Sequence, residues 1–303
     1  MKKRTLTVIA ILMSVMGLSL LLYPTVSDYM KRQASNRAIS DYVASVEPLD
    51  DDSYDELLEA ARSYNERLAK KSGFSLSLSG AELEEYSSLL DIDSSGVMGY
   101  VAVPKVDISL PIYHGTGDEA LQNGVGHLEG SSLPVGGPGT HAVFSGHTGL
   151  PSAKLFTDLD QLVVGDTFTV RVLKETLTYQ VDQILVVLPD DTDALQIQPG
   201  EDYCTLMTCT PYGVNSHRLL VRGHRISAPS QEETPPDTIE QSPDPVPNST
   251  NPSGAGAELW LLIAAILTLT LLLMTLLWWG QARKRAKRHR ENKKQPSQDP
   301  PET

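Results

Sequence analysis

Two long runs of apolar residues, one near each end of the chain, are the strongest pattern in the sequence. Residues 5–23 and 259–279 contain no charged side chain, and each approaches the roughly 20 residues that a membrane-spanning helix needs. The first run exceeds the apolar core of a typical signal peptide, and no A-x-A-like cleavage site follows it. The pattern therefore predicts an uncleaved signal anchor at residues 5–24 and a second span at residues 258–280.

The positive charges next to these runs predict their orientation. Lys2, Lys3 and Arg4 precede the first run, and eight Lys and Arg residues follow Gly280. The stretch 228–258, just before the second run, contains no Lys or Arg. Because basic flanks stay on the cytoplasmic side, we expect both termini inside the cell and the part between the spans outside. The basic tail is interpreted as an anchor against anionic lipid.

Between the spans, the hydrophobic spacing changes from a helical to a strand period. Apolar and small residues recur at helical spacing over 27–71, with a break at Pro48 and the acidic run 50–52, after which Ser53 is the expected N-cap. Residues 72–80 read as a loop. From Gly96 onward, short alternating or β-branched runs predict strands, at 99–103, 167–172, 177–181, 184–187, 203–208 and 217–221. Such regular short strands favour a closed β-barrel over a sandwich.

These patterns divide the chain into seven parts. The predicted boundaries are 1–4 cytoplasmic N-terminus, 5–24 signal anchor, 25–92 helical segment with a possible lid, 93–228 barrel domain, 229–257 extracytoplasmic stalk, 258–280 transmembrane helix and 281–303 basic cytoplasmic tail. The stalk is rich in Pro, Ser and acidic residues, with too few large apolar residues to bury a core. Asn248 in this stalk begins an N-x-S/T tripeptide, which is common by chance.

Charge distribution narrows the possible functions. The 303 residues carry a net charge of −13, but residues 33–280 hold 34 acidic and only 12 basic residues, a net of −22. An acidic body offers little positive surface to neutralise phosphates, so nucleic acid is not an expected partner. With only two cysteines, the chain is not a small scaffold held together by disulfides.

The two cysteines lie five residues apart in one predicted strand. At about 3.3 Å per residue, Cys204 and Cys209 are roughly 16 Å apart, too far for a disulfide, and two cysteines at this spacing do not form a structural zinc site. We interpret Cys204, in mid-strand, as a small buried residue. Cys209 ends its strand before the turn Thr210–Gly213, where a scaffold can present a nucleophile.

A reactive thiolate needs a nearby positive charge or a histidine. If residues 210–216 form a hairpin loop, Arg218 lies opposite Cys209; an ordinary surface arginine is the alternative. The histidine partner must come from a set that the residues alone do not resolve: His114, His127, His141, His147, His217 and His224. His147 is favoured by its place at a strand end before a Gly/Pro loop.

Five segments of the chain resemble the sortases, Gram-positive transpeptidases with a β-barrel fold. The segment TLMTC at 205–209 matches the family's T-L-x-T-C signature, and SGHTGLP at 145–151 is similar to its catalytic histidine segment. The run 209–223, and residues 98–100 with 112–115, resemble the pilus-building class C branch. The resemblance covers residues 93–226, and a C-terminal membrane span is also typical of that class.

This resemblance implies roles for three residues. Cys209 would be the nucleophile, His147 the proton donor and acceptor, and Arg218 the stabiliser of the oxyanion, which leaves the other histidines with structural roles. The enzyme would cleave an LPXTG-like sorting signal between Thr and Gly and join the acyl group to a lysine amine of a pilin subunit. Its partners would be LPXTG-bearing pilins and, through two spans, the lipid bilayer, with no cofactor and no metal.

One departure from the class concerns the lid before the barrel. Class C sortases usually carry an Asp-Pro-aromatic motif that covers the cysteine, but residues 72–91 contain no Asp-Pro pair. Phe74 and Tyr86 are the aromatic residues that could cover the site instead. Alternatives to pilus assembly are a sortase that anchors proteins to a cell-wall precursor, a cysteine peptidase with water as the acceptor, and a non-catalytic membrane-tethered binding module.

Overall fold

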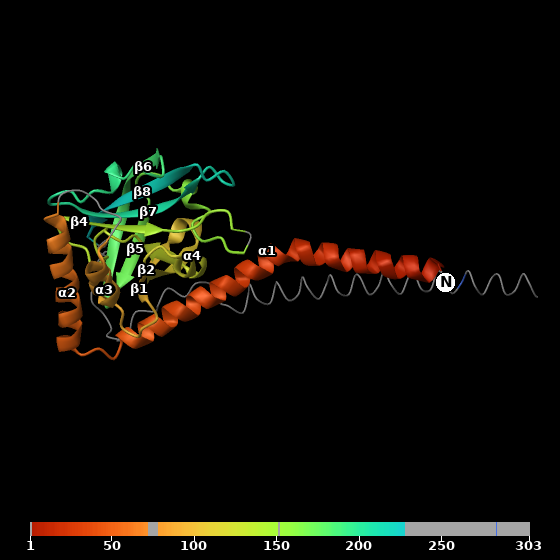
Figure 1. Ribbon diagram of the computed structural model, residues 1–303, viewed down its shortest axis with the longest axis horizontal. Helices are drawn as coiled ribbons and strands as arrows, with labels where there is room; N and C mark the ends of the chain where they lie inside the picture. Colours follow the sequence, from red (N-terminus) through yellow and green to blue (C-terminus); the bar gives the residue numbers. More distant parts are fainter. Residues whose placement is uncertain (1, 72–77, 151, 228–282, 284–303) are drawn as a thin grey trace, which may run out of the picture. The chain divides into compact units, whose positions relative to one another are not determined.

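The computed structural model describes residues 2–71, 78–150, 152–227 and 283. Eight strands form a closed barrel in the order β1-β2-β3-β4-β7-β8-β6-β5 (Figure 1), which confirms the predicted mainly-β closed barrel. The strands are β1 Val97–Val103, β2 Ile108–His114, β3 Val125–His127, β4 Thr140–Ser145, β5 Thr167–Val172, β6 Glu175–Val187, β7 Asp202–Thr210 and β8 His217–Ile226. Between the strands lie the short helices η1 Pro104–Val106, α4 Asp118–Asn123, η2 Leu159–Gln161 and η3 Asp193–Leu195.

The observed strands differ from the predicted ones in two ways. The two runs expected at 177–181 and 184–187 are one strand, β6, whose register against β8 shifts between Val181 and Gln183. Strands β2, β3 and β4 were not among the predicted runs, although a strand end before His147 was expected. Most pairs are antiparallel, but β2 with β3 and β4 with β7 are parallel. The β4–β7 pair joins segments 57 or more residues apart in sequence, and it determines which side chains lie beside the end of β7.

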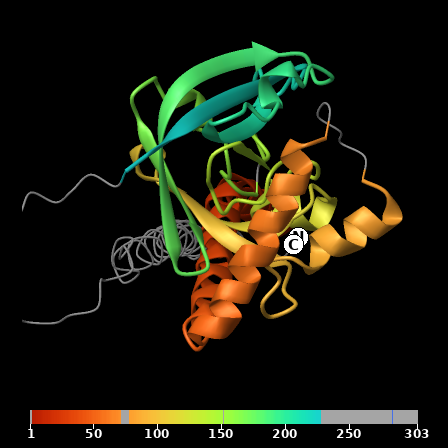
Figure 2. The ribbon, with the colours of Figure 1, turned by 90° about the vertical axis from the view of Figure 1, so that its left-hand side faces the viewer.

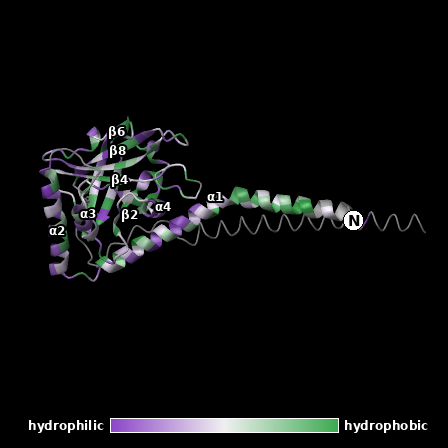
Figure 3. Cartoon of the chain, in the orientation of Figure 1, coloured by the Kyte–Doolittle hydropathy of each residue, from purple (hydrophilic) through white to green (hydrophobic). Residues whose placement is uncertain are grey.

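The N-terminal region is helical, with boundaries that differ from the prediction. Helix α1 runs without interruption over Lys2–Val46 and contains Pro24, so the apolar run and the first part of the expected 27–71 helix are one element. Figure 3 shows the apolar residues concentrated in the N-terminal part of α1. Helix α2, Asp51–Ala69, has Asp50 as its N-cap, with the carboxylate accepting from the Ser53 N–H. Ser53 is therefore the third helical residue and not the expected cap.

The C-terminal half of α1 is fixed to the barrel through buried and polar contacts. The Tyr42 side chain is 1% exposed, and its hydroxyl donates to the Met98 carbonyl at 2.9 Å and accepts from the Leu173 N–H at 2.8 Å. Ile39 and Val46 pack with Val97 and Tyr100 of β1. The helix that begins in the apolar run is thus docked directly on the core of the barrel.

Two further helices cover the barrel. The Asn65 side chain of α2 donates to the Leu133 carbonyl and accepts from the Leu133 N–H, at 2.9 and 2.7 Å. Helix α3, Gly80–Ser88, begins with a capping box between Ser79 and Glu82 and buries Tyr86. Figure 2, viewed from the side of α2, shows α2 in front of the strands and α3 beside it.

Within the described residues, one helix is long and apolar enough to cross a membrane. It covers Ile9–Val46, and its most apolar window has no buried residues. This agrees with an N-terminal membrane anchor. The second predicted span at 258–280, the stalk at 229–257 and all of the tail at 281–303 except Arg283 lie outside the described residues.

Candidate active site

The end of β7 and the start of β8 bring Cys209 and Arg218 together. The two strands are antiparallel, and their register pairs Cys209 directly with Arg218; such opposing residues have Cβ atoms about 4.5–5.5 Å apart. Both side chains are partly exposed. The hairpin expected from the sequence is confirmed. The guanidinium of Arg218 donates to the carbonyls of Asn215 and His217 at 3.4 and 3.2 Å. These hydrogen bonds hold it next to the β7–β8 loop.

The segment after β4 carries His147 to the same place. Strand β4 runs parallel to β7 with Ser145 opposite Met207. The next residue, Gly146, donates its N–H to the Met207 carbonyl at 3.0 Å and accepts from the Thr208 hydroxyl at 2.7 Å. His147 follows at once, so its backbone lies at the level of Cys209 on the neighbouring strand. His147 is partly exposed.

Both threonines of the T-L-x-T-C segment tie β7 to β4. Thr208 binds Gly146, as above, and the Thr205 hydroxyl donates to Nε2 of His141 at 2.7 Å. His141 Nδ1 donates in turn to the Gln196 carbonyl at 3.1 Å. Burial lowers the pKa of His141 to about 4, which keeps the ring neutral with one donor and one acceptor nitrogen. The motif therefore fixes the strand pair that holds Cys209 beside His147.

An apolar strip lies on the same sheet face as Cys209 and Arg218. Met207 pairs with Leu220 two residues before the Cys209–Arg218 pair. Because side chains alternate faces along a strand, both pairs lie on the same face of the sheet. Met207 and Leu220 belong to a cluster with buried Leu128, Val143 and Leu195 and half-buried Leu185, Val187 and Ala194. Leu220 is itself buried, so only the half-buried members of the cluster are open to contact from an extended peptide.

The loops on either side of the site touch each other. Gly149 has a positive φ of 73°, and a Cβ there would lie 2.9 Å from the Tyr212 ring. Tyr212 follows the cis Thr210–Pro211 peptide bond in the β7–β8 loop. On the other side, a Cβ at Gly146 would lie 2.6 Å from the buried Phe156 ring. Glycine at these positions lets the His147 segment fit between the two aromatic rings.

The two cysteines are both free thiols, with different surroundings. Cys204 is 0% exposed, and desolvation raises the pKa of its thiol well above the ordinary value. Cys209 is partly exposed at the strand end. The interpretation of Cys204 as a buried core residue is confirmed, and Cys209 is the more exposed of the two thiols.

His127 has a structural environment on the opposite face of the sheet from Cys209. Its Nε2 donates to the Ser132 carbonyl at 2.8 Å, and its Nδ1 accepts from the Tyr86 hydroxyl at 3.0 Å. Complete burial lowers the pKa of His127 to about 4. His114 contacts the carbonyls of Gly96 and Leu89 through its two ring nitrogens. These contacts occupy the rings of both histidines within the fold.

Tyr86 does not cover Cys209. Its hydroxyl bonds His127 and accepts from the Gly115 N–H at 2.9 Å, and its ring stacks on His127. His127 pairs with Phe144, which pairs with Leu206, so these three side chains share one face of the sheet. Leu206 lies three residues from Cys209 on β7, so Leu206 and Cys209 point to opposite faces. Tyr86 therefore anchors α3 to the barrel core. Phe74, the other aromatic residue considered for a lid, lies outside the described residues.

A cavity of about 770 Å³ lies at the opposite end of β7. It is lined by α2 residues, the glycine-rich segment 135–140, Asp202 and Arg225. Asp202 is seven residues from Cys209 along one strand, roughly 23 Å away, so this cavity is separate from the candidate site. Within the described part of the chain, no group of three His, Cys, Asp or Glu residues could hold a metal ion.

Comparison with known proteins places these residues in a family context. Residues 101–226 match the sortase domain family. The chain is similar to the crystal structure of sortase C1 from Streptococcus agalactiae, with 55% identity, a TM-score of 0.62, and coverage of 63% of this chain and 99% of that chain. It is also similar to the X-ray structure of Clostridium perfringens sortase C with the C-terminal cell wall sorting motif, with 44% identity, a TM-score of 0.57, and coverage of 64% and 100%.

A curated relative gives the same family. The chain is 30% identical to sortase A of Streptococcus agalactiae serotype III over 148 residues, which are 46% of this chain. The match spans 60% of that relative's length.

Proposed function

The chain belongs to the sortase family of cysteine transpeptidases, with class C enzymes among its solved relatives, and on that premise we propose that it polymerises pilin subunits at the cell surface. In this proposal it cleaves an LPXTG-like sorting signal between Thr and Gly. It then transfers the acyl group to a lysine amine of a neighbouring pilin. The observation that carries the proposal is the pairing of Cys209 with Arg218 at the end of β7, beside the segment that carries His147.

The first half of the reaction forms a thioester. The Cys209 thiolate attacks the threonine carbonyl carbon, and the electron pair of the C=O bond moves to oxygen. Arg218, opposite the thiol, donates to this oxyanion, whose charge develops only on the way to the tetrahedral intermediate. When the intermediate collapses, the C–N bond breaks and His147 protonates the departing glycine amine.

The second half transfers the acyl group. The lysine amine attacks the thioester carbonyl, and His147, now deprotonated, takes the proton from the attacking nitrogen. The Cys209 thiolate leaves, and an isopeptide bond remains. The proposed roles need no metal and no organic cofactor.

The apolar strip supports binding of the sorting signal. The half-buried Met207, Leu185 and Val187 lie on the face of Cys209, so the leucine of an extended LPXTG segment can pack against them while the threonine carbonyl lies at the thiol. The Clostridium perfringens sortase C structure contains a sorting motif, which is the same class of ligand.

Identifying the covalent product tests which group accepts the acyl chain. Coexpression of the full chain with a pilin that carries both a sorting signal and the acceptor lysine should give a ladder of multimers that resists SDS, and Cys209→Ala should give none. Pilin linked only to cell-wall fragments would support the alternative of an anchoring sortase, and cleaved monomer alone would support a peptidase. Normal surface assembly with Cys209→Ala would favour a non-catalytic binding module.

The N-terminal apolar helix supports anchoring in the cell membrane. We extend this to a two-span topology, with spans at 5–24 and 258–280, both termini in the cytoplasm, and the barrel with its 229–257 stalk outside. Cysteine-free tags at each end, probed with protease on intact cells, test it. Both tags should be protected while the barrel is cut; a cleaved C-terminal tag would contradict the second span.

A further inference from the structure

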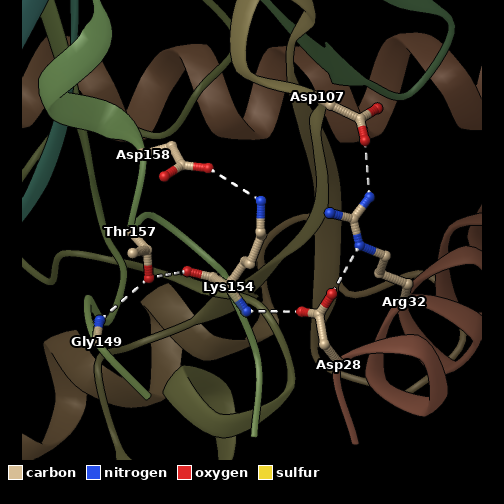
Figure 4. Close-up of polar contacts among 7 residues, drawn as sticks. All are labelled: Asp28, Arg32, Asp107, Gly149, Lys154, Thr157 and Asp158. Atoms are coloured by element: carbon tan, nitrogen blue, oxygen red, sulfur yellow. Dashed lines mark hydrogen bonds and ion pairs between the residues drawn. The ribbon is translucent and has the colours of Figure 1, made fainter. Parts of the chain in front are cut away.

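A chain of contacts joins the membrane-anchor helix α1 to the segment that carries His147. The carboxylate of Asp28, five residues beyond the apolar run 5–23, accepts from the backbone N–H of Lys154 at 2.8 Å. Figure 4 shows this contact at the centre of a network that includes Arg32, Thr157 and Gly149. Asp28 and Lys154 are 126 residues apart in sequence, so the contact is purely tertiary.

From Lys154 the contacts continue to His147. The Thr157 hydroxyl donates to the Lys154 carbonyl and accepts from the Gly149 N–H, the latter at 3.1 Å. The neighbouring Phe156 donates its N–H to the carbonyl of His147 itself, at 3.0 Å. The described residues 147–150 and 152–157 thus form a turn whose outer end is held by Asp28 and whose inner end holds the His147 backbone.

The Asp28 carboxylate is itself held in place. Arg32, one turn further along α1, donates from Nε to Asp28 at 3.1 Å and from Nη1 to Asp107 at 2.8 Å. Asp107 follows β1 and η1, in the barrel. The guanidinium therefore joins the helix to the barrel and orients the carboxylate toward Lys154.

The turn also needs an external restraint because it contains a strained residue. Leu155 adopts a positive φ of 42°, a region that residues other than glycine rarely occupy. The side chains of Leu155 and Phe156 are buried in the core of the barrel. The hydrogen bond between Asp28 and Lys154 holds the turn from the side of α1. Together these contacts hold the turn from two sides.

We propose that Asp28 is a positioning residue for His147, so that the helix that anchors the enzyme in the membrane also orders its proton donor. Asp28 touches neither the substrate nor the reacting atoms; it acts through the Lys154 N–H and the 147–157 turn. The proposal rests on the proposed function, because it assumes that His147 transfers the proton. It assigns to the region next to the membrane a part in catalysis as well as in anchoring.

The expected effect is on turnover. Without the carboxylate, the turn has more freedom and His147 spends less time where it can protonate the leaving amine, so kcat falls. The hydrogen bonds of Asp28 go to Arg32 and Lys154 and not to the apolar strip that would hold the substrate, so KM should change little. Small displacements of a catalytic group commonly cost about ten-fold or more in rate.

Three variants of the full chain, in detergent micelles, test the proposal with a fluorogenic sorting-signal peptide. Asp28→Ala removes the acceptor. Asp28→Asn keeps an oxygen that can accept the Lys154 N–H and removes the charge. Asp166→Ala is the matched control, because Asp166 also accepts a backbone N–H, from Val163 at 2.7 Å, and pairs with a cation, Lys105 at 2.7 Å. Its side chain is as exposed as that of Asp28, 19% against 24%.

We expect kcat to fall about ten-fold in Asp28→Ala with KM within about two-fold of the parent, to recover largely in Asp28→Asn, and to stay unchanged in Asp166→Ala. Three results would overturn the proposal: equal kcat values for Asp28→Ala and Asp166→Ala, an effect of Asp28→Ala confined to KM, or equal losses in Asp28→Ala and Asp28→Asn. Cys209→Ala, measured in parallel, separates the two proposals, because an active Cys209→Ala variant would refute the proposed function itself.

Discussion

Cys204 and Cys209 lie on the same strand, yet only Cys209 is accessible to solvent, as its proposed role as nucleophile requires. Cys204 lies inside the barrel, where desolvation raises the pKa of its thiol and leaves no path for a substrate. Cys209 lies where β7 leaves the barrel, opposite a guanidinium. An odd separation along a strand places the two thiols on opposite faces, and the closed barrel makes one of these faces interior.

This difference predicts selective labelling. Iodoacetamide applied to the folded full chain should modify one thiol, Cys209, and Cys204 should react only after denaturation. Peptide mapping by mass spectrometry identifies the labelled residue, and Cys209→Ala provides the control. Labelling of Cys204 at a comparable rate in the folded state would contradict its burial.

The candidate site was predictable from sequence to different extents for its three residues. The Cys209–Arg218 pair follows from a local hairpin, since the strand pattern and the turn residues lie in one stretch of about ten residues. His147 reaches the site through the parallel β4–β7 pairing, which no local pattern encodes; only resemblance to the sortases selected it among six histidines. The contact of Asp28 with Lys154 was not foreseen, because it depends on how α1 docks on the barrel.

At the scale of elements, two of the strands absent from the predicted runs, β2 and β3, have physical explanations. Strand β2 contains Pro111, which argues against a central strand; in the barrel, pairing of β2 with β3 begins one residue later, at Ile112. Strand β3 has only three residues, too few for an alternating pattern. Helix α1 was divided in the prediction because its apolar and amphipathic halves were treated as separate elements.

The docking of α1 on the barrel depends on a buried hydroxyl. Tyr42→Phe removes a donor to Met98 and an acceptor for the Leu173 N–H, and leaves both backbone groups unpaired in a buried place. We expect the free energy of unfolding to fall by about 2 kcal/mol. Chemical denaturation of the full chain in detergent measures it.

Tyr54→Phe is the control for that measurement. The Tyr54 hydroxyl bonds Glu175 at an exposed position, where water can replace it, so its loss should cost less than about 0.5 kcal/mol. Equal stabilities of Tyr42→Phe and Tyr54→Phe would show that the buried contact does not hold α1.

At the scale of the whole molecule, acidic and basic residues are concentrated in different parts of the sequence. The residues from 33 to 280 carry a net charge of −22, and the basic residues gather at the two ends. In the proposed topology this acidic part is extracytoplasmic and the basic ends contact the inner leaflet. Arg218 is therefore one of few cations on an acidic body, which gives its position opposite Cys209 more weight.

Two buried histidines make the stability of the fold depend on pH. His127 and His141 have pKa values of about 4, below the ordinary value of 6.5, because burial disfavours the charged ring. The unfolded chain therefore binds more protons between these values, and the free energy of unfolding falls as pH decreases from about 6.5 toward 4. Each imidazole contributes roughly 3 kcal/mol over the full window.

Thermal unfolding of the full chain in detergent at about pH 7 and about pH 5 measures this dependence. Carboxyl groups titrate mainly below this range, so the histidines dominate the change. We expect a lower Tm at the acidic pH, and a smaller difference between the two pH values in His141→Gln. The same Tm at both pH values would contradict the neutral, buried state of these rings.

The central claim is that Cys209 forms a thioacyl intermediate with a sorting signal, and peptide mapping by mass spectrometry tests it most directly. The full chain is mixed with an LPXTG-type peptide, quenched in acid within the turnover time and digested. We predict a mass increase equal to the acyl fragment that ends in threonine, located on the peptide containing Cys209 and absent from Cys209→Ala. Peptide cleavage without an adduct, or an adduct on any other residue, would contradict the account.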